Sequence, residues 1–474
     1  MPFDVKTPES PGWWLVRLLK RLQDEAVDVE RLENLYEGRH RLAIGDEELD
    51  LSDFQEMARS NYLSLVVEAV VERQKVVGFR SGDGPEGDDE TWKLWQSANL
   101  DADQTLLYRT ARSCRRAYVI VGPHPRKRDK VLATVEHPSQ VTVETYPEDD
   151  REVRAALKFF KDDILGLPTA YLYLPTAVVK FRARSAGGAL TPAFFAAQAV
   201  AEWEVVSVSE NPTAPEVPVV EFGNRPTLLG RCRAEFEDVV PIQNRINQTL
   251  LHRLVAEKFA SFRQTAILNI ALEEDEDGEP TAPDLPTSPG LAWLLQGEHL
   301  AMWQSEQTDT AAIIKAVETD IRDLAAITRT PPHYLLNSIV NASGDALKSA
   351  ETGLVAKVKE RNLQDGESWE QVVHLMHVVA GTGRAAESLE VVWADPESRS
   401  LAEVSDAVLK QKDAGVPWRM RMEQLGYSPP EIDRMEADRA ADALLASFAL
   451  PPEPTPAAAP ASSTEEPPDP AEAA

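Results

Sequence analysis

Cysteine is scarce in this sequence of 474 residues, which contains only Cys114 and Cys232. Two cysteines so far apart provide neither a disulfide framework nor a cysteine zinc site, and they fit a reducing compartment. Long apolar runs are also missing, because no stretch approaches the roughly 20 apolar residues that cross a membrane. Short apolar runs near the start are interrupted by Arg17, so we expect no export signal and no membrane anchor.

Basic residues are few relative to acidic ones: 49 Lys and Arg against 78 Asp and Glu give a formal net charge of −29. A protein that wraps duplex DNA needs a basic surface to displace counterions, so this balance excludes that class. The negative net charge still allows a protein that contacts DNA without binding it tightly. The sequence also has no Gly-Lys pair and no G-x-S-x-G, which excludes a Walker A motor and a nucleophile-elbow hydrolase.

The first half of the chain mixes helical and strand patterns. One helical stripe consists of Leu63, Val66, Val67, Val70 and Val71, and it ends near Gly78. Short β-branched runs at 117–121, 131–135 and 141–145 are separated by turn residues and predict strands, and this pattern continues through 155–221. The predicted fold class is therefore α+β.

The second half predicts two long helices, at 231–262 and 310–328, on either side of an insertion at 263–307. Pro241 must either kink the first of these helices or mark its true start. The apolar stripe expected to pack the first helix recurs every four residues, at Ile242, Ile246, Leu250 and Leu254.

A prolyl segment, "TPPHYLLNSIVNASG", follows the second long helix at residues 330–344. Pro331 and Pro332 should stop that helix, and Ser343 should cap a third one that continues from 345 towards 380. The segment contains no charged residue from Pro331 to Gly344, although 27% of the chain is charged. Beyond it we expect a strand near Val391, a helical region at 400–449 and a disordered Pro/Ala/Glu-rich tail.

Two groups of residues imitate metal sites. The acidic run places Glu273, Asp275, Asp277, Gly278 and Asp284 at calcium-loop spacing. Prolines inside the run and an aspartate in the last position favour a solvated hairpin tip instead. Glu370, His374 and His377 could share a helix face, but their order is not that of a zinc protease, so we expect polar residues on a helix surface. No catalytic residue, metal ligand or cofactor is assigned.

Several segments together resemble portal (head-to-tail connector) proteins of tailed double-stranded DNA bacteriophages, of the SPP1 type. The segments that carry the resemblance are "LYEGRHRL" (35–42), "NYLSLVVEAVVERQKVVGFR" (61–80), "CRRAYVIVG" (114–122), "FEDVVPIQNRINQTLLHRLVAEKFASFRQ" (236–264), "PPHYLL" with "NASGDALKSAETGLVAKVKER" (331–361) and "VVWADPESRSLAEVSDAVLKQKDAGVP" (391–417). No one segment is specific, but their order and spacing are, over about residues 30 to 440.

The resemblance implies a ring-forming portal fold with an α+β wing, a long-helix stem, a small α/β clip and a helical crown. The implied parts are the wing (1–229), first stem helix (230–262), clip (263–307), second stem helix (308–329), tunnel loop (330–342), long wing helix and returning strand (343–399), crown (400–449) and disordered tail (450–474).

The implied function is structural, not enzymatic. A ring, typically a dodecamer, would occupy one capsid vertex of the virion after assembly in the host cytoplasm. Double-stranded DNA would pass through it without sequence-specific binding, and no membrane is involved. The implied partners are other copies of the chain, the terminase large subunit, a head-tail adaptor, the major capsid protein and a scaffolding protein.

The resemblance also assigns candidate residues. The DNA-channel residues would be Pro331, His333, Tyr334, Asn337, Ser338 and Asn341. The partner-docking residues of the clip would be Asp275, Asp277, Trp293 and Trp303. Alternatively, the apolar residues of the tunnel loop pack between neighbouring loops as a gasket. The two tryptophans would then pack inside the clip or against the next subunit. The alternative functions are a metal-dependent nuclease and a monomeric scaffold or adaptor protein of a phage particle.

Overall fold

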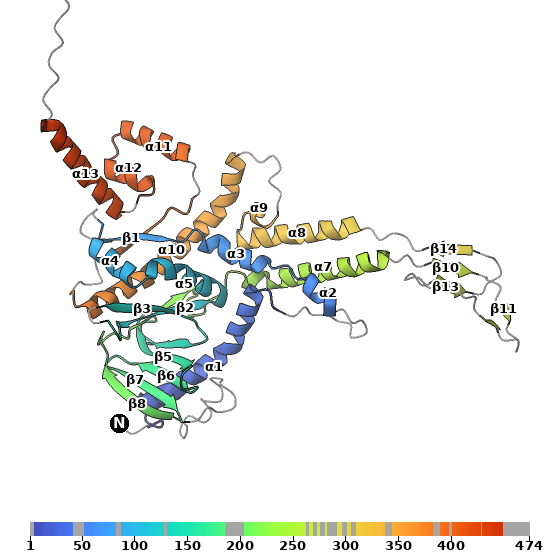
Figure 1. Ribbon diagram of the computed structural model, residues 1–474, viewed down its shortest axis with the longest axis horizontal. Coiled ribbons are helices and arrows are strands. Elements are labelled where there is room, and N and C mark those ends of the chain that lie inside the picture. The colour runs from blue at the N-terminus through green and yellow to red at the C-terminus, as the bar shows by residue number, and fades with distance from the viewer. Residues whose placement is uncertain are drawn as a thin grey trace, which may run out of the picture.

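A computed structural model shows a mixed helix and sheet body from which a long helical hairpin projects (Figure 1). The predicted α+β class is therefore confirmed. The structure describes residues 4–40, 52–81, 87–127, 130–184, 203–261, 265–268, 273–274, 280–281, 292–295, 301–304, 310–336, 344–382, 389–397, 401–427 and 429–448.

A five-stranded antiparallel sheet forms one end of the body. Its strands follow one another in sequence order: β4 (Val141–Thr145), β5 (Val153–Lys161), β6 (Pro168–Tyr173), β7 (Ala177–Ala183) and β8 (Trp203–Glu210). Helix α1 (Pro11–Tyr36) packs on this sheet through Trp14, Leu15 and Leu18. The start of α1 was not predicted, because Arg17 interrupts the apolar run. In the fold Arg17 lies on the outer side and pairs with Glu144.

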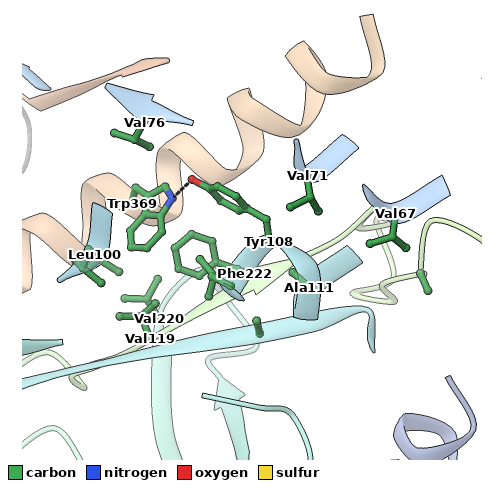
Figure 2. Packing of buried hydrophobic residues seen from close by; sticks show 14 of the residues in the cluster. Val67, Val71, Val76, Leu100, Tyr108, Ala111, Val119, Val220, Phe222 and Trp369 are labelled. Atoms are coloured by element: carbon green, nitrogen blue, oxygen red, sulfur yellow. Dashed lines mark hydrogen bonds between the residues drawn. The ribbon is translucent and has the colours of Figure 1, made fainter. Parts of the chain in front are cut away.

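A second, three-stranded sheet lies against the longest helix. Its order is β3 (Val131–Glu136), β2 (Arg116–Pro123) and β9 (Val219–Gly223), and helices α5 (Leu100–Cys114) and α10 (Gly344–Ala380) pack against it. Trp369 of α10 is fully buried, and its ring centroid lies 4.6 Å from that of Trp95 and 4.7 Å from that of Phe222. Its indole Nε1 donates a hydrogen bond of 2.8 Å to the Tyr108 hydroxyl (Figure 2).

Helix α3 (Tyr62–Val71) confirms the apolar stripe predicted there, since all five of its residues are buried in the core. Strand β1 (Val76–Ser81) pairs antiparallel with β15 (Leu389–Trp393), which confirms a strand near Val391. Helix α4 (Asp89–Ser97) follows β1, with Asp88 capping it by accepting from the Thr91 amide. The C-terminal half of the chain thus returns to complete the N-terminal body.

The hairpin consists of α7 (Val240–Ser261) and α8 (Thr310–Thr328). Helix α7 begins nine residues later than predicted, after a 3₁₀ turn at Glu237–Val239. Pro241 therefore marks the true start rather than a kink, because the first turn of a helix tolerates a residue without an amide hydrogen. The short helix α2 (Ser52–Met57) lies against α7.

Short strands occupy the far end of the hairpin (Figure 1). Strand β10 (Thr265–Leu268) lies between β13 (Ala292–Leu295), which is parallel to it, and β14 (Ala301–Gln304), which is antiparallel. Two further strands, β11 (Glu273–Glu274) and β12 (Pro280–Thr281), pair with each other. The predicted insertion at 263–307 therefore contains short strands in the parts that the structure describes.

Three helices follow β15 and form a group away from the hairpin, at the upper left of Figure 1: α11 (Leu401–Asp413), α12 (Trp418–Gln424) and α13 (Pro429–Phe448). This group contacts the body through an ion pair between Arg80 and Glu423, 2.7 Å apart. Its own helices are joined by Arg419 and Asp433, 2.6 Å apart. Among the described helices, none is long and apolar enough to span a membrane.

Candidate functional site

The root of the hairpin packs into the main core. Ile246 of α7 is fully buried, and Ile242 and Leu250 pack against the same core as partly buried residues. Leu254 is half-buried, whereas Leu251, which the four-residue stripe left out, is buried. The predicted stripe is therefore correct at its centre but leaves the buried face of the helix towards its end. A strict four-residue repeat must do so, because an α-helix has 3.6 residues per turn.

Two fully buried polar residues of α7 were missed because sequence patterns treat glutamine and asparagine as surface residues. Gln243 Oε1 accepts a hydrogen bond of 3.0 Å from the Tyr62 amide, and its Nε2 donates one of 2.6 Å to the Ser60 carbonyl. Asn247 Oδ1 accepts a bond of 3.0 Å from the Ser60 amide. These bonds attach α7 to the segment that enters α3. Gln243 and Asn247 are four residues apart and fall on the same helix face as Ile246. This spacing was the sequence signal that could have predicted their burial.

An ion pair also joins the two helices of the hairpin. The Arg245 guanidinium binds both carboxylate oxygens of Asp320, at 2.9 and 2.6 Å. Helix α8 buries Val317, Ile321 and Leu324 against the core. Planar two-point contacts of this kind fix the relative direction of the helices.

The prolyl segment does not leave the helical path at once, because residues Pro332–Leu335 form the short helix α9. Pro331 and Leu335 are buried. The Tyr334 hydroxyl accepts a hydrogen bond of 2.6 Å from Arg73, and its ring packs on the cluster formed by α3 and α10. His333 Nε2 lies 3.8 Å from a carboxylate oxygen of Glu351.

The rest of this segment, including Asn337, Ser338, Asn341 and Ser343, lies outside the described residues. Of the candidate channel residues, the structure therefore places Pro331, His333 and Tyr334 together, where the segment meets α3 and α10. The neighbouring α10 starts at Gly344, one residue before the predicted position.

Two of the candidate docking residues, Trp293 and Trp303, belong to the strands at the far end of the hairpin. Trp293 of β13 and Trp303 of β14 both pair in register with Ala266 of the central strand β10. The backbone thus brings the two tryptophans, ten residues apart, to the same level of one sheet. Asp275 and Asp277 lie outside the described residues, as do Gly278 and Asp284 of the calcium-like run.

The suspected histidine cluster on α10 is not a surface group, so that expectation was wrong for His377. His377 is fully buried, with Nε2 2.8 Å from the Thr91 hydroxyl and Nδ1 2.7 Å from the Thr382 hydroxyl. His374 instead contacts Glu216, and Glu370 accepts a hydrogen bond from the Val391 amide. Within the described residues, no group of three His, Cys, Asp or Glu side chains could hold a metal ion.

A buried charged network attaches α10 to the root of the hairpin. Glu235 accepts a hydrogen bond of 2.7 Å from Arg361 and lies 3.7 Å from the Lys357 ammonium. Lys357 Nζ also donates a bond of 2.8 Å to the Thr328 carbonyl at the end of α8. Burial alone would raise the pKa of Glu235, but Lys357 and Arg361 beside it lower that pKa to about 2.

A second buried pair, Arg112 with Asp365, joins α10 to α5. Arg112 also donates to Gln74 Oε1 at 3.2 Å and to Asn224 Oδ1 at 3.1 Å. The hairpin root, the prolyl segment and the three-stranded sheet are thus all held by α10. No sequence motif predicts these ion pairs, whose two residues lie up to 253 positions apart in the chain.

Comparisons with known proteins show which family the chain is similar to. The model of a family described as phage portal protein, SPP1 Gp6-like, matches residues 17–442. The portal protein of Mycobacterium phage L5 is 26% identical over 447 residues, covering 90% of this chain and 88% of its own. That of Mycobacterium phage D29 is 28% identical over 399 residues, covering 80% and 78%. A chain in a solved virion of a native gene transfer agent particle has a TM-score of 0.40 at 10% identity, covering 83% of this chain and 95% of its own.

Proposed function

Because the chain belongs to the SPP1 Gp6-like family of phage portal proteins, a structural family of the virion, we propose that its copies close into a ring at one capsid vertex. Double-stranded DNA enters and leaves the capsid through the centre of this ring. The observation that carries the proposal is the family match over residues 17–442. A dodecamer is the subunit number that we expect, and contacts between unlike surfaces of successive copies close such a ring.

The projecting hairpin supports the assignment of the stem. Helices α7 and α8 extend away from the body, with β10, β13 and β14 beyond their ends (Figure 1). In the proposed ring the hairpins stand side by side as the stem, and the strands form the clip. The clip docks the terminase large subunit during packaging and a head-tail adaptor afterwards. The crown corresponds to α11, α12 and α13.

The charge of the chain supports a channel through which DNA slides. A net charge of −29 disfavours tight binding of phosphate, because each basic contact would add counterion release to the binding free energy. In the proposed ring the uncharged prolyl segment faces the channel. Tyr334 is held by Arg73 within its own chain, so its role is to support the loop, while the polar residues further along contact DNA.

A direct test uses a phage whose genome encodes this chain. A nonsense mutation in the gene should yield capsids without DNA, and supplying the intact chain in trans should restore filled, infectious particles. Filled capsids in the absence of the chain would contradict the proposal. Magnesium-dependent cleavage of DNA by the purified chain would instead favour the nuclease alternative.

A prediction for the channel concerns Asn337 and Asn341. Replacing both with lysine is expected to leave rings intact but to reduce the yield of DNA-filled capsids about tenfold or more, since new lysines at the channel wall bind phosphate. The yield is measured as nuclease-protected DNA per capsid. Replacing both with glutamine is the matched control and should package normally. Normal packaging by the lysine variant, in rings shown to be intact, would show that this segment does not line the channel.

A prediction for the clip concerns Trp303. Replacing it with alanine is expected to weaken adaptor binding by at least about 30-fold, because a tryptophan at the centre of an interface often contributes 2 kcal/mol or more. Surface plasmon resonance with purified rings and adaptor measures this loss. If adaptor affinity and ring stability both equal those of the unaltered protein, Trp303 is neither a docking anchor nor a structural part of the clip.

A further inference from the structure

A loop between β9 and α7 exposes two adjacent leucines. Leu228 and Leu229 form the tip of the turn from Thr227 to Gly230, with exposed fractions of 105% and 81%. We call the tip, residues 227–231, the leucine knob. Single exposed apolar residues are common on protein surfaces, but two adjacent leucines at the tip of a loop expose a compact apolar patch of the kind that marks a contact site.

The leucine knob is held by hydrogen bonds rather than left free. The Gly230 amide donates to the Thr227 carbonyl at 2.8 Å, and Gly230 has a φ of +68°, which glycine adopts without strain. At the base of the loop, fully buried Asn224 donates to the Arg233 carbonyl at 2.7 Å and accepts from Arg112 at 3.1 Å. A loop fixed in this way loses little conformational entropy on binding.

A groove of about 710 Å³ lies between α10 and β15. Its lining includes Leu389 and Val391 of β15 and the half-buried ring of Trp393, which approaches Gly366 of α10. Leu363 of α10, with an exposed fraction of 72%, stands at its side. The groove therefore combines apolar lining residues with an apolar residue that is largely exposed to solvent.

The leucine knob and the groove lie on opposite sides of α10. Lys357, Arg361 and Gln364 line a cavity together with Arg225 and Arg233 from the base of the knob loop. The groove is lined instead by Leu363, Gly366 and Glu370. At 3.6 residues per turn, these two sets of α10 residues face directions about half a turn apart. The leucine knob of one chain therefore lies on the side of α10 away from its own groove, and a second copy is needed to fill that groove.

The charges of the two surfaces are complementary. Arg231 is part of the leucine knob, and Arg225 and Arg233 flank it. These two flanking arginines share the carboxylate of Asp238, at 2.7 and 3.2 Å. The charged residues that line the groove are Glu367, Glu370, Glu390 and Asp395, together with Lys359. Burial raises the pKa of Glu370, and the carboxylates of Glu367 and Glu390 raise it further. The three arginines of the knob loop thus outnumber the carboxylate of Asp238, and the groove has an excess of negative charge.

We propose that Leu228 and Leu229 of one copy insert into the groove between α10 and β15 of the next copy, with the flanking arginines facing the glutamates of the groove. This contact joins unlike surfaces on opposite sides of one helix, so repeating it around an axis produces a ring. The inference rests on the proposed ring and identifies one of the contacts that close it.

A cysteine pair tests the contact in assembled rings. The variant carries Leu228→Cys and Leu363→Cys in a Cys232→Ser background, while buried Cys114 is kept. Oxidation of purified rings with copper phenanthroline should give a ladder of covalent oligomers on a non-reducing gel. The matched control pairs Leu228→Cys with Ile164→Cys, which is 94% exposed in the turn before β6, and should give no ladder.

The outcomes separate this inference from the proposed function. Intact rings without the 228–363 ladder overturn the inference and leave the proposed function standing. Unaltered protein that forms no rings overturns both. A second variant, with Leu228→Asp and Leu229→Asp, should fold with an unchanged melting temperature but sediment as a monomer. Rings formed as readily as by the unaltered protein would contradict the inference.

Discussion

Replacing Ile246 by aspartate is expected to cost about 4 kcal/mol or more of folding free energy and to abolish ring formation. Ile246 is fully buried in the main core at the root of the hairpin, and an unpaired carboxylate there would lose its hydration without gaining a partner. Urea unfolding monitored by circular dichroism measures the change. Sedimentation velocity of the same samples measures assembly.

Gln248→Asp provides the matched control for this variant. Gln248 lies on the same helix, two residues further on, and is exposed. An added carboxylate at that position should change the free energy of unfolding by no more than about 0.5 kcal/mol. If Ile246→Asp unfolds at the same urea concentration as the control, Ile246 is not part of a packed core and the stem is not anchored as described.

Replacing Glu235 by glutamine is expected to destabilise the protein by about 3–5 kcal/mol at neutral pH. The change leaves Lys357 and Arg361 buried without their counter-charge, and breaking a buried ion pair from one side has a cost of this order. Glu360→Gln is the matched control, because Glu360 also contacts Arg361 but is largely exposed. Its removal should change the free energy of unfolding by less than about 1 kcal/mol.

The carboxylate of Glu235 should also make the folding stability of the protein sensitive to acid. The pKa of Glu235 falls from 4.5 to about 2 on folding, so protons bind more tightly to the unfolded chain. The stabilisation is therefore complete above about pH 4.5 and is lost as the pH falls towards 2. Urea unfolding in steps from pH 7 to pH 3 should show this loss in the unaltered protein and a smaller loss in Glu235→Gln. Identical acid profiles would show that Glu235 does not titrate as described.

Local patterns predicted the elements whose determinants lie close together in the sequence. The stripe from Leu63 to Val71 became the buried face of α3, and the prolines after α8 ended that helix. The start of α7 was misplaced, because the charged and apolar residues of 231–239 are compatible with a helix. Tertiary contacts hold them in another conformation, among them the backbone bonds of Arg233 with Asn224 and of Glu235 with Arg112. Boundaries that depend on tertiary contacts are invisible to periodicity.

Residues that act through distant partners could not be predicted. His377 was expected on a surface and lies buried between Thr91 and Thr382, because α10 is covered on that side by α4. Glu235, Lys357 and Arg361 belong to no motif, and their pairing depends on how α8, α10 and the chain before α7 meet. The family, by contrast, was inferred from the order and spacing of whole segments, and the match over residues 17–442 confirms it.

The candidate site was predictable only in outline. Sequence placed Trp293 and Trp303 in one insertion, and strand pairing adds that both stand opposite Ala266. Sequence also singled out the uncharged prolyl segment, but not the bond from Arg73 that fixes Tyr334. The leucine knob and its groove were not predicted from the sequence. Two leucines in a loop, and Gly366 in the helix that lines the groove, form no periodic pattern.

Electron microscopy of the purified full-length protein tests ring formation most directly. We predict closed rings with a central hole, a narrow stem on one side and a wider wing around it. Mass photometry of the same preparation should give a discrete species near twelve times the chain mass of 52.4 kDa. A single species at the mass of one chain, without rings at any protein concentration or in virions, would contradict the account.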